Sequence, residues 1–380
     1  MKTLYGAIIC CFILSLNISG AFAEEEPYRI GAIFAVTGPA SWLGEPQKTT
    51  VKMLEEQINA AGGINGRKIE VIIEDNLGAE DKTVLAFKKL VKRHKVVAII
   101  GPSRSGCTMA IKPLAERYKV PVVACAAAAA IVNPVNPWVF KTAQNDADAA
   151  RSIFDKARQL GIKRMAIMSS TDGFGAAGRG QLKTIAPDYD ISIVADETYG
   201  PKDTDMTAQL TKIKGTDAQA IINWSIVPAQ TTVLRNRTQL GMTIPFFQSH
   251  GFGNINYARS AGASADGVLF PQGRILAVDT VADDHAQKPV IARYKKDYEA
   301  QAKTDVSAFG GYAHDSLMLV VDAIKAVGAD RAKIREYIEN RKNFVGVSGV
   351  FNFSPENHVG LGQESFEMLT VKDSNFIVAE

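Results

Sequence analysis

Apolar runs of strand length alternate with amphipathic, helix-length stretches along the first third of the chain. The runs and the stretches between them are residues 28–34, 47–61, 69–73, 81–93, 96–100, 105–119 and 120–124. A strand, a helix and a second strand of the same sheet form a right-handed crossover. The alternation therefore predicts an α/β fold whose parallel sheet is covered by helices on both faces.

The same pattern begins again further along the chain. The second series is 147–160, 164–169, 175–185, 191–194, 207–213, 220–223, 228–240, 245–247 and 267–270. This repetition predicts two doubly wound, Rossmann-like lobes, between which the chain first crosses near residues 142–146. We expect three later helices, at 289–301, 314–327 and 330–341, to return to the first lobe, and 344–353 and 365–371 to be strands. The predicted lobes are 24–143 with 273–350, and 144–272 with 351–380.

The first 23 residues have the pattern of a signal peptide. Lys2 precedes an apolar stretch from Leu4 to Ile18, and Ala21-Phe22-Ala23 is a small-x-small cleavage pattern. A retained membrane anchor is the alternative, but about 18 apolar residues are needed to span a bilayer. We expect cleavage after Ala23 and export to the periplasm.

Composition excludes several classes of function. The 43 Lys and Arg residues nearly balance the 40 Asp and Glu residues and form no basic block, which argues against a nucleic-acid partner. Cys107 and Cys125 are the cysteines beyond residue 23, so the chain is no disulfide scaffold. They could pair with each other, although two buried free thiols are the favoured interpretation. The five histidines are scattered, and no zinc-type spacing is present, so no metal or cofactor is expected.

Two glycine-containing loops could suggest enzymes. Residues 173–178 match the dinucleotide pattern G-x-G-x-x-G, but four polar residues, 169–172, separate them from the preceding strand. A permissive loop that opens a helix is favoured over a nicotinamide site. Residues 101–105 resemble the nucleophile elbow of hydrolases but have Ser105 where the second glycine is required. A secreted hydrolase therefore stays an unlikely alternative.

The same 101–105 loop fits a binding role better. It joins a predicted strand to a predicted helix, so free amides near Ser105 would present the positive end of the helix dipole to an anion. Ser103 and Ser105 could add hydroxyl donors, and Arg104 a charge-assisted bond. The simpler alternative is a solvated helix start that Ser105 caps.

Short motifs spread over the whole mature chain resemble the periplasmic solute-binding proteins of ABC importers, in the leucine/isoleucine/valine-binding family. The motifs are residues 37–39, 58–69, 74–76, 100–102 with Ser105, 140–142 and 173–175. The resemblance implies a type I periplasmic binding protein fold, with two lobes joined by three hinge crossovers that close on a ligand. It also implies an inner-membrane permease and ATPase as partners, a monomer, and no enzymatic activity. A receptor's sensor subunit is an alternative role.

Position by position, the resemblance places Ser105 on a serine that helps to hold the ligand carboxylate. Ala126 falls on a backbone contact, and Ala128 falls where amino-acid binders use a threonine hydroxyl for the ammonium group. Arg104 and Leu77 replace a pair of disulfide-bonded cysteines.

In the second lobe, Phe174 and Ile226 stand at two tyrosine positions, and His250 stands where amino-acid binders place the glutamate that neutralises the ammonium. A buried ammonium without acceptors costs several kcal/mol, whereas a micromolar complex has about 8 kcal/mol in total. We therefore expect a small hydrophobic carboxylate, aromatic or otherwise apolar, ahead of leucine, isoleucine or valine. The candidate ligand-binding residues are Ser103, Arg104, Ser105, Ala126, Ala127, Ala128, Phe174, Trp224, Ile226 and His250.

Overall fold

A computed structural model describes residues 25–380, and the predicted signal peptide lies outside these residues. The strands are β1 (Tyr28–Phe34), β2 (Ile69–Asp75), β3 (Ala98–Ile100), β4 (Val122–Ala124), β5 (Val139–Lys141), β6 (Arg164–Ser170), β7 (Ser192–Tyr199), β8 (Ala220–Trp224), β9 (Phe246–Gln248), β10 (Leu269–Gln272), β11 (Phe344–Val345), β12 (Val350–Phe351), β13 (Glu367–Lys372) and β14 (Asn375–Val378). The helices are α1 (Ser41–Ala60), α2 (Glu80–Lys92), α3 (Ser105–Tyr118), α4 (Asp146–Gln159), α5 (Gly173–Ile185), α6 (Thr207–Lys214), α7 (Ala229–Gln239), α8 (Ile255–Ala261), α9 (Lys288–Ala302), α10 (Ala308–Val327) and α11 (Arg331–Glu339).

The first sheet has the order β2-β1-β3-β4-β5, and all its strands are parallel. Its central strand β3 is completely buried, as expected when helices cover both faces of a parallel sheet. Helices α9 to α11 return to this sheet: α10 packs along α1, and the Tyr294 hydroxyl of α9 lies 2.7 Å from the Thr50 hydroxyl of α1.

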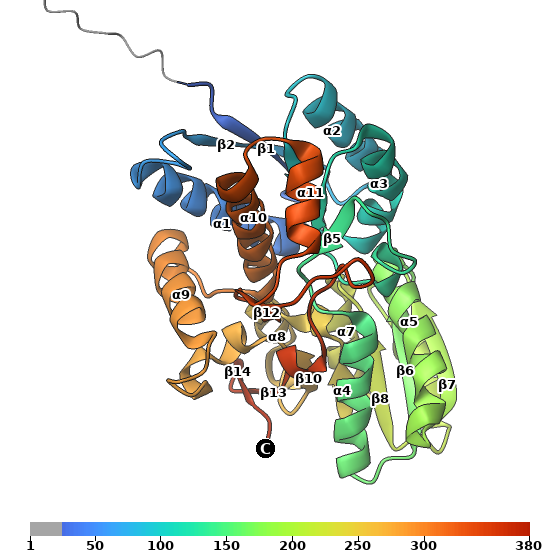
Figure 1. Cartoon of the computed structure of the whole chain (residues 1–380). Coiled ribbons are helices and arrows are strands. Elements are labelled where there is room, and N and C mark those ends of the chain that lie inside the picture. The colour runs from blue at the N-terminus through green and yellow to red at the C-terminus, as the bar shows by residue number, and fades with distance from the viewer. Residues whose placement is uncertain (1–24) are drawn as a thin grey trace, which may run out of the picture.

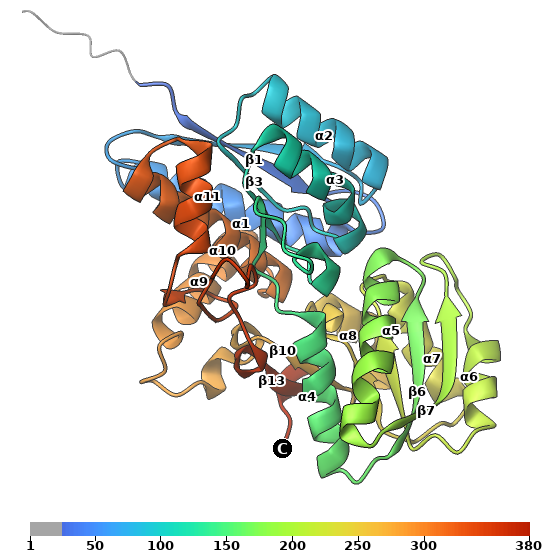
Figure 2. The same cartoon turned by 45° about the vertical axis from the view of Figure 1, so that its right-hand side comes forward.

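The second sheet has the order β14-β13-β10-β9-β8-β6-β7. Strands β6 to β10 are parallel, but β13 pairs antiparallel with β10, and β14 pairs antiparallel with β13. The chain therefore crosses between the sheets three times: after β5, after β10 and before β13. The two-lobed α/β fold predicted from the alternation is confirmed, and Figures 1 and 2 show the lobes around the two sheets. The exact lobe boundaries stay a prediction.

Several local predictions differ from the structure. The stretch 344–353 is not one strand, because β11 and β12 form an antiparallel hairpin around residues 346–349. Strand β5 and helix α8 were not predicted: β5 is only three residues long, and α8 only seven. Such short elements carry too little periodicity to be recognised in a sequence.

Helix α1 begins at Ser41, six residues before the predicted start, and contains Pro46. Proline lacks an N–H group, so the carbonyl of Trp42, four residues earlier, receives no helical hydrogen bond from it. The Asn254 side-chain amide of the second lobe donates to this carbonyl instead, over 2.9 Å. The proline therefore leaves an acceptor free for a contact between the lobes.

Two further features are established for the part of the chain described. Cys107 and Cys125 are buried free thiols, and Cys125 Sγ lies 3.5 Å from the Ser316 hydroxyl. Within residues 25–380, no helix combines the length and apolar character needed to cross a membrane.

Candidate ligand-binding cleft between the lobes

The loops that follow the parallel strands of the two sheets face each other. In the first lobe they follow β3 and β4, and in the second they follow β6, β8 and β9. The two sides are in close contact: a Cβ atom added to Gly173, at the start of α5, would lie 3.1 Å from the Cα of Gly106, at the start of α3. The structure is therefore a closed form, in which two helix N-termini meet across the cleft.

On the first-lobe side, the cleft is formed by the loop after β4 (residues 125–128) and the start of α3 at Ser105. We call this side the floor of the cleft. The side chain of Ser105 is 3 % exposed, and its hydroxyl accepts a hydrogen bond from the Ala128 N–H over 3.3 Å. Ala126 and Ala127 are buried beside it. These small side chains leave the backbone of residues 125–128 close to Ser105, as a carboxylate-binding site would require.

Ser103 lies close to this floor in the sequence but is used differently. Its hydroxyl accepts a hydrogen bond from the Ala35 N–H over 3.0 Å and donates to the Gln47 side-chain oxygen. Both partners belong to the first lobe, where they join the end of β1 to α1. The hydroxyl is thus already occupied by contacts within the lobe.

Arg104 forms an ion pair between the lobes. One guanidinium nitrogen lies 2.9 Å from Oδ2 of Asp172, and the other donates to the Gly78 carbonyl over 2.9 Å. The other carboxylate oxygen of Asp172 accepts from the N–H groups of Phe174 and Gly175, so Asp172 caps α5. Arg104 therefore reaches the N-terminus of the opposing helix through the capping carboxylate.

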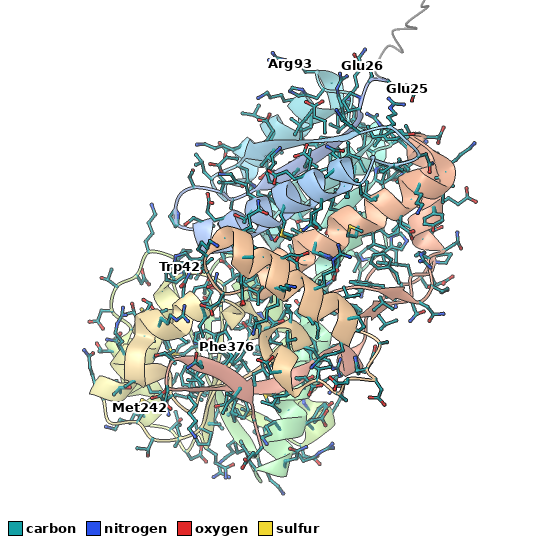
Figure 3. The ribbon with its side chains drawn as sticks, turned by 90° about the vertical axis from the view of Figure 1, so that its left-hand side faces the viewer. Glu25, Glu26, Trp42, Arg93, Met242 and Phe376 are labelled. Carbon is teal, nitrogen blue, oxygen red and sulfur yellow. The ribbon has the colours of Figure 1, made fainter. Side chains whose placement is uncertain are left out.

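Trp42 adds a second contact between the lobes. Its ring packs edge-on against Tyr257 of α8, with ring centroids 4.9 Å apart, and its carbonyl accepts the bond from Asn254. Figure 3 shows Trp42 at the end of α1, where the lobes meet.

Aromatic rings form the second-lobe side of the cleft, which we call the wall. Phe174, Trp224 and His250 contact one another, with ring centroids 5.3 to 5.8 Å apart, and Phe366 lies 5.7 Å from His250 on another side. Trp224 is the last residue of the buried strand β8, and His250 comes two residues after β9. The sequence-predicted residues Phe174, Trp224 and His250 are thus brought together as one cluster.

This wall also contains buried polar atoms without partners. Neither ring nitrogen of His250 has a hydrogen-bond partner in residues 25–380, and the same holds for the Trp224 indole N–H and the Gln248 side-chain nitrogen. Buried polar groups are almost always paired. The His250 nitrogens are therefore available to a ligand or to water, whereas the Trp224 indole N–H faces Gly178 of α5.

Burial keeps His250 neutral. Burial, together with a smaller effect of the positive charge of Lys141, lowers the pKa of the imidazole to about 3. A neutral imidazole can both donate and accept a hydrogen bond, so it can bind a ring hydroxyl or a keto oxygen. It cannot replace the negative charge of a glutamate.

This neutral histidine has a consequence for stability. In the unfolded chain His250 protonates near pH 6.5, whereas in the folded protein it stays neutral, so stability is lost as pH falls below 6.5. Between pH 6.5 and 5 we expect the unfolding free energy of the wild type to fall by about 1 to 2 kcal/mol more than that of His250→Gln. Urea unfolding of both proteins at several pH values measures the difference. Parallel pH curves would contradict it.

Ile226 lies apart from the ring cluster. It lines an apolar pocket of about 150 Å³ between the lobes together with Pro39, Ala40, Leu77, Arg104, Pro201, Lys202, Val227 and Pro228. Of the sequence-predicted residues, Arg104 and Ile226 share this pocket. A cavity of about this volume is large enough for a benzene ring.

Sequence reasoning missed two charged residues near the floor of the first lobe. Lys141 at the end of β5 and Asp146 at the start of α4 are both fully buried. The single lysine in the apolar run 138–141 was the available signal, because charged residues are almost never fully buried without a reason.

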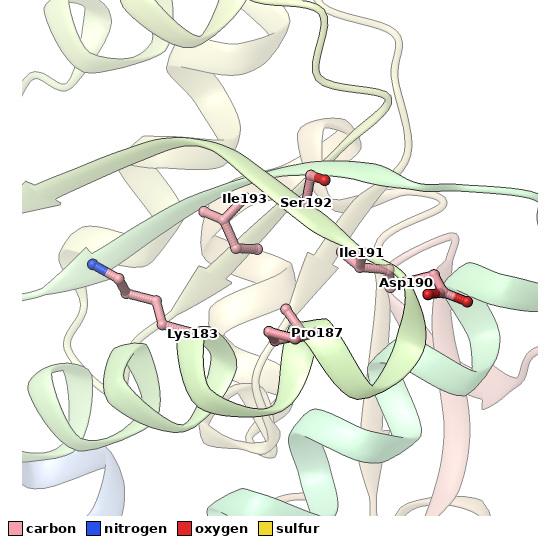
Figure 4. A pocket seen from close by; sticks show the side chains of 7 residues that line it. Lys183, Pro187, Asp190, Ile191, Ser192 and Ile193 are labelled. Atoms are coloured by element: carbon pink, nitrogen blue, oxygen red, sulfur yellow. The ribbon is translucent and has the colours of Figure 1, made fainter.

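The described residues offer no metal site, and a further hollow lies away from the cleft. Among the described residues, no cluster of three or more His, Cys, Asp or Glu side chains could hold a metal ion. A hollow on the outside of the second lobe, between the end of α5 and β7, is formed by Lys183, Ala186, Pro187, Asp190, Ile191, Ser192 and Ile193 (Figure 4). None of these residues belongs to the predicted site.

Residues 173–178 are not a loop, as the sequence predicted, but the first turns of α5, which Asp172 caps. Their glycines serve packing. A Cβ atom on Gly175 would lie 1.9 Å from the Ser170 carbonyl oxygen, and one on Gly178 would lie 2.0 Å from the Trp224 indole. The glycine at 173 allows the approach of Gly106. These contacts account for the dinucleotide-like pattern without a nucleotide.

Comparison with known proteins agrees with this architecture. The family model described as "Periplasmic binding protein" matches residues 27–374. The chain therefore belongs to the periplasmic binding protein family, and the type I, leucine/isoleucine/valine-binding resemblance is confirmed.

Curated relatives are distant in sequence but similar over most of their length. The leucine-, isoleucine-, valine-, threonine- and alanine-binding protein of Pseudomonas aeruginosa is 24 % identical over 320 residues, which cover 82 % of each chain. The Leu/Ile/Val-binding protein homolog 3 of Brucella melitensis is 22 % identical and covers 96 % of each chain.

Solved structures of the same fold are also similar. An extracellular ligand-binding receptor from Rhodopseudomonas palustris HaA2 has a TM-score of 0.88 and 26 % identity, over 93 % of this chain and all of that one. The branched-chain amino acid transporter substrate binding protein LivJ of Streptococcus pneumoniae, in complex with isoleucine, has a TM-score of 0.83 and 25 % identity, over 93 % of this chain and 99 % of that one.

Proposed function

We propose that this chain is the periplasmic substrate-binding component of an ABC importer and captures a small hydrophobic carboxylate, aromatic or otherwise apolar, by closure of its lobes. The observation that carries the ligand class is the second-lobe wall, where a neutral, unpartnered His250 stands among three aromatic rings. Nothing in that wall neutralises an ammonium group.

The ligand carboxylate would bind to the first lobe. Helix α3 begins at Ser105, so its free amides and dipole favour an anion there. The Ser105 hydroxyl lies beside the 125–128 backbone, because it accepts the Ala128 N–H. The ligand would lie with its carboxylate on this floor and its apolar body against Phe174 and Trp224.

Closure follows from contacts that bridge the lobes. Arg104 with Asp172, and Trp42 with Asn254 and Tyr257, exist only when the lobes meet. A ligand favours the closed form only through interactions that the open form lacks. In this proposal the chain acts as a monomer, is exported after cleavage at Ala23, performs no catalysis, and delivers its ligand to an inner-membrane permease and ATPase.

A branched-chain amino acid is the second candidate ligand. It is favoured by the names of the curated relatives and by the isoleucine in the similar solved structure. A sensor role beside a receptor would use the same closure, whereas a secreted hydrolase would need turnover of ester or amide substrates.

Calorimetry on protein that has been unfolded and refolded, to remove any co-purifying ligand, tests the ligand class. We expect benzoate-type acids to bind with micromolar or better affinity and leucine to bind at least a hundredfold more weakly. Tight leucine binding without acid binding would reverse the assignment. Mass spectrometry of the protein before stripping would identify a natural ligand directly.

The carboxylate end can be tested by substitution. Because Arg104 joins the lobes and Ser105 lies on the floor, we expect Arg104→Ala and Ser105→Ala each to weaken binding of an aromatic acid by about tenfold or more. Isothermal titration measures the affinities, and Arg93→Ala, on the surface of the first lobe, is the control. Unchanged affinity in both cleft variants would place the anion elsewhere.

A further inference from the structure

A lysine lies buried beside the floor of the cleft. Lys141 ends strand β5 and has no exposed surface. Its ammonium donates to the carbonyl of Ala127 and to the side-chain oxygen of Asn145, the latter over 3.3 Å. An ammonium has three N–H donors, so one donor is left over after these two bonds.

No acidic side chain in residues 25–380 contacts this ammonium. Asp146 and Asp148 act on it only through longer-range attraction. One oxygen of Asp146 instead accepts from the Ala129 N–H over 3.0 Å, and its other oxygen has no partner among the described residues. Burial lowers the pKa of Lys141 to about 8, so the side chain is mostly charged at neutral pH. A buried charge without a contacting counter-ion is costly unless a ligand supplies one.

Lys141 interacts with groups on both sides of the cleft. Its acceptor Ala127 is the neighbour of Ala128, whose N–H donates to Ser105. Its charge also acts on His250 in the opposite lobe. Lys141 thus lies beside the backbone of residues 127–128, next to Ser105, and His250 belongs to the aromatic wall of the opposite lobe.

We infer that the Lys141 ammonium is the counter-ion of the ligand carboxylate and determines which ligands are accepted. This inference rests on the proposed function and assigns a specificity residue within the same site. The third N–H of Lys141 binds a carboxylate oxygen held on the Ser105 floor. A ligand with an α-ammonium group would bring a second positive charge into the same low-dielectric space, where like charges repel strongly.

The neutral state of His250 is consistent with this role of Lys141. With a fixed cation already present in the first lobe, an acid at position 250 would pair with Lys141 and neutralise it. A neutral histidine keeps the charge of Lys141 available to the ligand.

The test compares benzoate with its uncharged analogue benzamide on the refolded protein, using isothermal titration. We expect the wild type to bind benzoate at least tenfold more tightly than benzamide. Lys141→Met, which keeps the length and removes the charge, is expected to weaken benzoate at least tenfold and to change benzamide by less than about threefold. Lys141→Arg is expected to restore the preference for benzoate.

Lys112→Met is the matched control. Lys112 also donates to two carbonyls of the first lobe, those of Ala130 and Pro134, each over 2.9 Å, but it is part-exposed and outside the cleft. Both affinities should stay within twofold of the wild type. Thermal melting checks that Lys141→Met is folded, and Lys141→Arg, which keeps the charge beside the buried Asp146, tests the role of Lys141 without removing that charge.

The outcomes separate the two proposals. If the wild type binds benzoate but Lys141→Met binds it equally well, the role of Lys141 is refuted and the proposed function stands. If the wild type binds leucine and none of the organic acids, the proposed function fails, and the assignment of Lys141 fails with it.

Discussion

Replacing His250 with glutamate is expected to weaken binding of an aromatic carboxylate by at least a hundredfold. The new carboxylate would lie in a fully buried position among Phe174, Trp224 and Phe366, beside the proposed place of the ligand. Like charges in a desolvated site cost several kcal/mol, and a hundredfold loss corresponds to about 3 kcal/mol. Isothermal titration with benzoate measures the effect.

The neutral variant His250→Gln separates charge from shape. Glutamine has nearly the size of glutamate and can donate and accept hydrogen bonds, so we expect its loss of affinity to be less than tenfold. If both variants lose affinity equally, steric fit rather than charge governs this position. If His250→Glu binds benzoate as well as the wild type does, the carboxylate does not share a space with residue 250.

Replacing Gly178 with alanine is expected to lower the free energy of unfolding by about 3 kcal/mol, at the upper end of the usual cost of overpacking a core. A Cβ atom at this position would lie 2.0 Å from the indole of Trp224, which is completely buried. Either α5 must move away from β8, or the indole must leave its place in the wall. Urea unfolding measures the loss, and a weaker affinity for benzoate should accompany it.

Gly180 provides the control on the same helix. It is exposed, and a Cβ atom there meets nothing within 4 Å. Because alanine favours a helix over glycine by about 1 kcal/mol, Gly180→Ala should leave stability unchanged or raise it. A Gly178→Ala protein as stable as the wild type would mean that the contact between α5 and Trp224 is looser than the structure shows.

The closed interface combines contributions from both lobes. The first lobe contributes a helix start, small alanines and a buried lysine, and the second lobe contributes rings and an uncharged histidine. Arg104 joins the sides through the carboxylate that caps α5, so that the ion pair connects the two helix starts directly. Pro46 contributes indirectly, because it frees the Trp42 carbonyl for Asn254.

Much of this could be predicted from the sequence alone. The alternation of strand and helix patterns gave the two doubly wound lobes, because hydrophobic periodicity is a local property that the chain carries whatever its surroundings. The loop after β3 was likewise predictable as a cleft element, since ligands bind at the carboxyl ends of parallel strands. Phe174, Trp224 and His250 were each nominated, and they form a single cluster.

What could not be predicted depends on contacts between distant segments. The hydroxyl of Ser103 is occupied by Ala35 and Gln47, and Ile226 lies in a pocket apart from the rings; neither fact follows from spacing. The antiparallel strands β13 and β14 join the second sheet only after the chain has crossed from one lobe to the other.

Lys141 shows most clearly the difference between what the sequence predicts and what the tertiary structure decides. In the sequence it is one lysine after three apolar residues, and its type gives only a positive charge. Its burial, its bonds to Ala127 and Asn145, and its electrostatic effect on His250 result from the pairing of β5 with β4 and from the closure of the lobes. The sequence determined the fold because hydrophobic periodicity is a local property, and the tertiary structure decided the burial and partners of Lys141 because these depend on segments distant in the sequence.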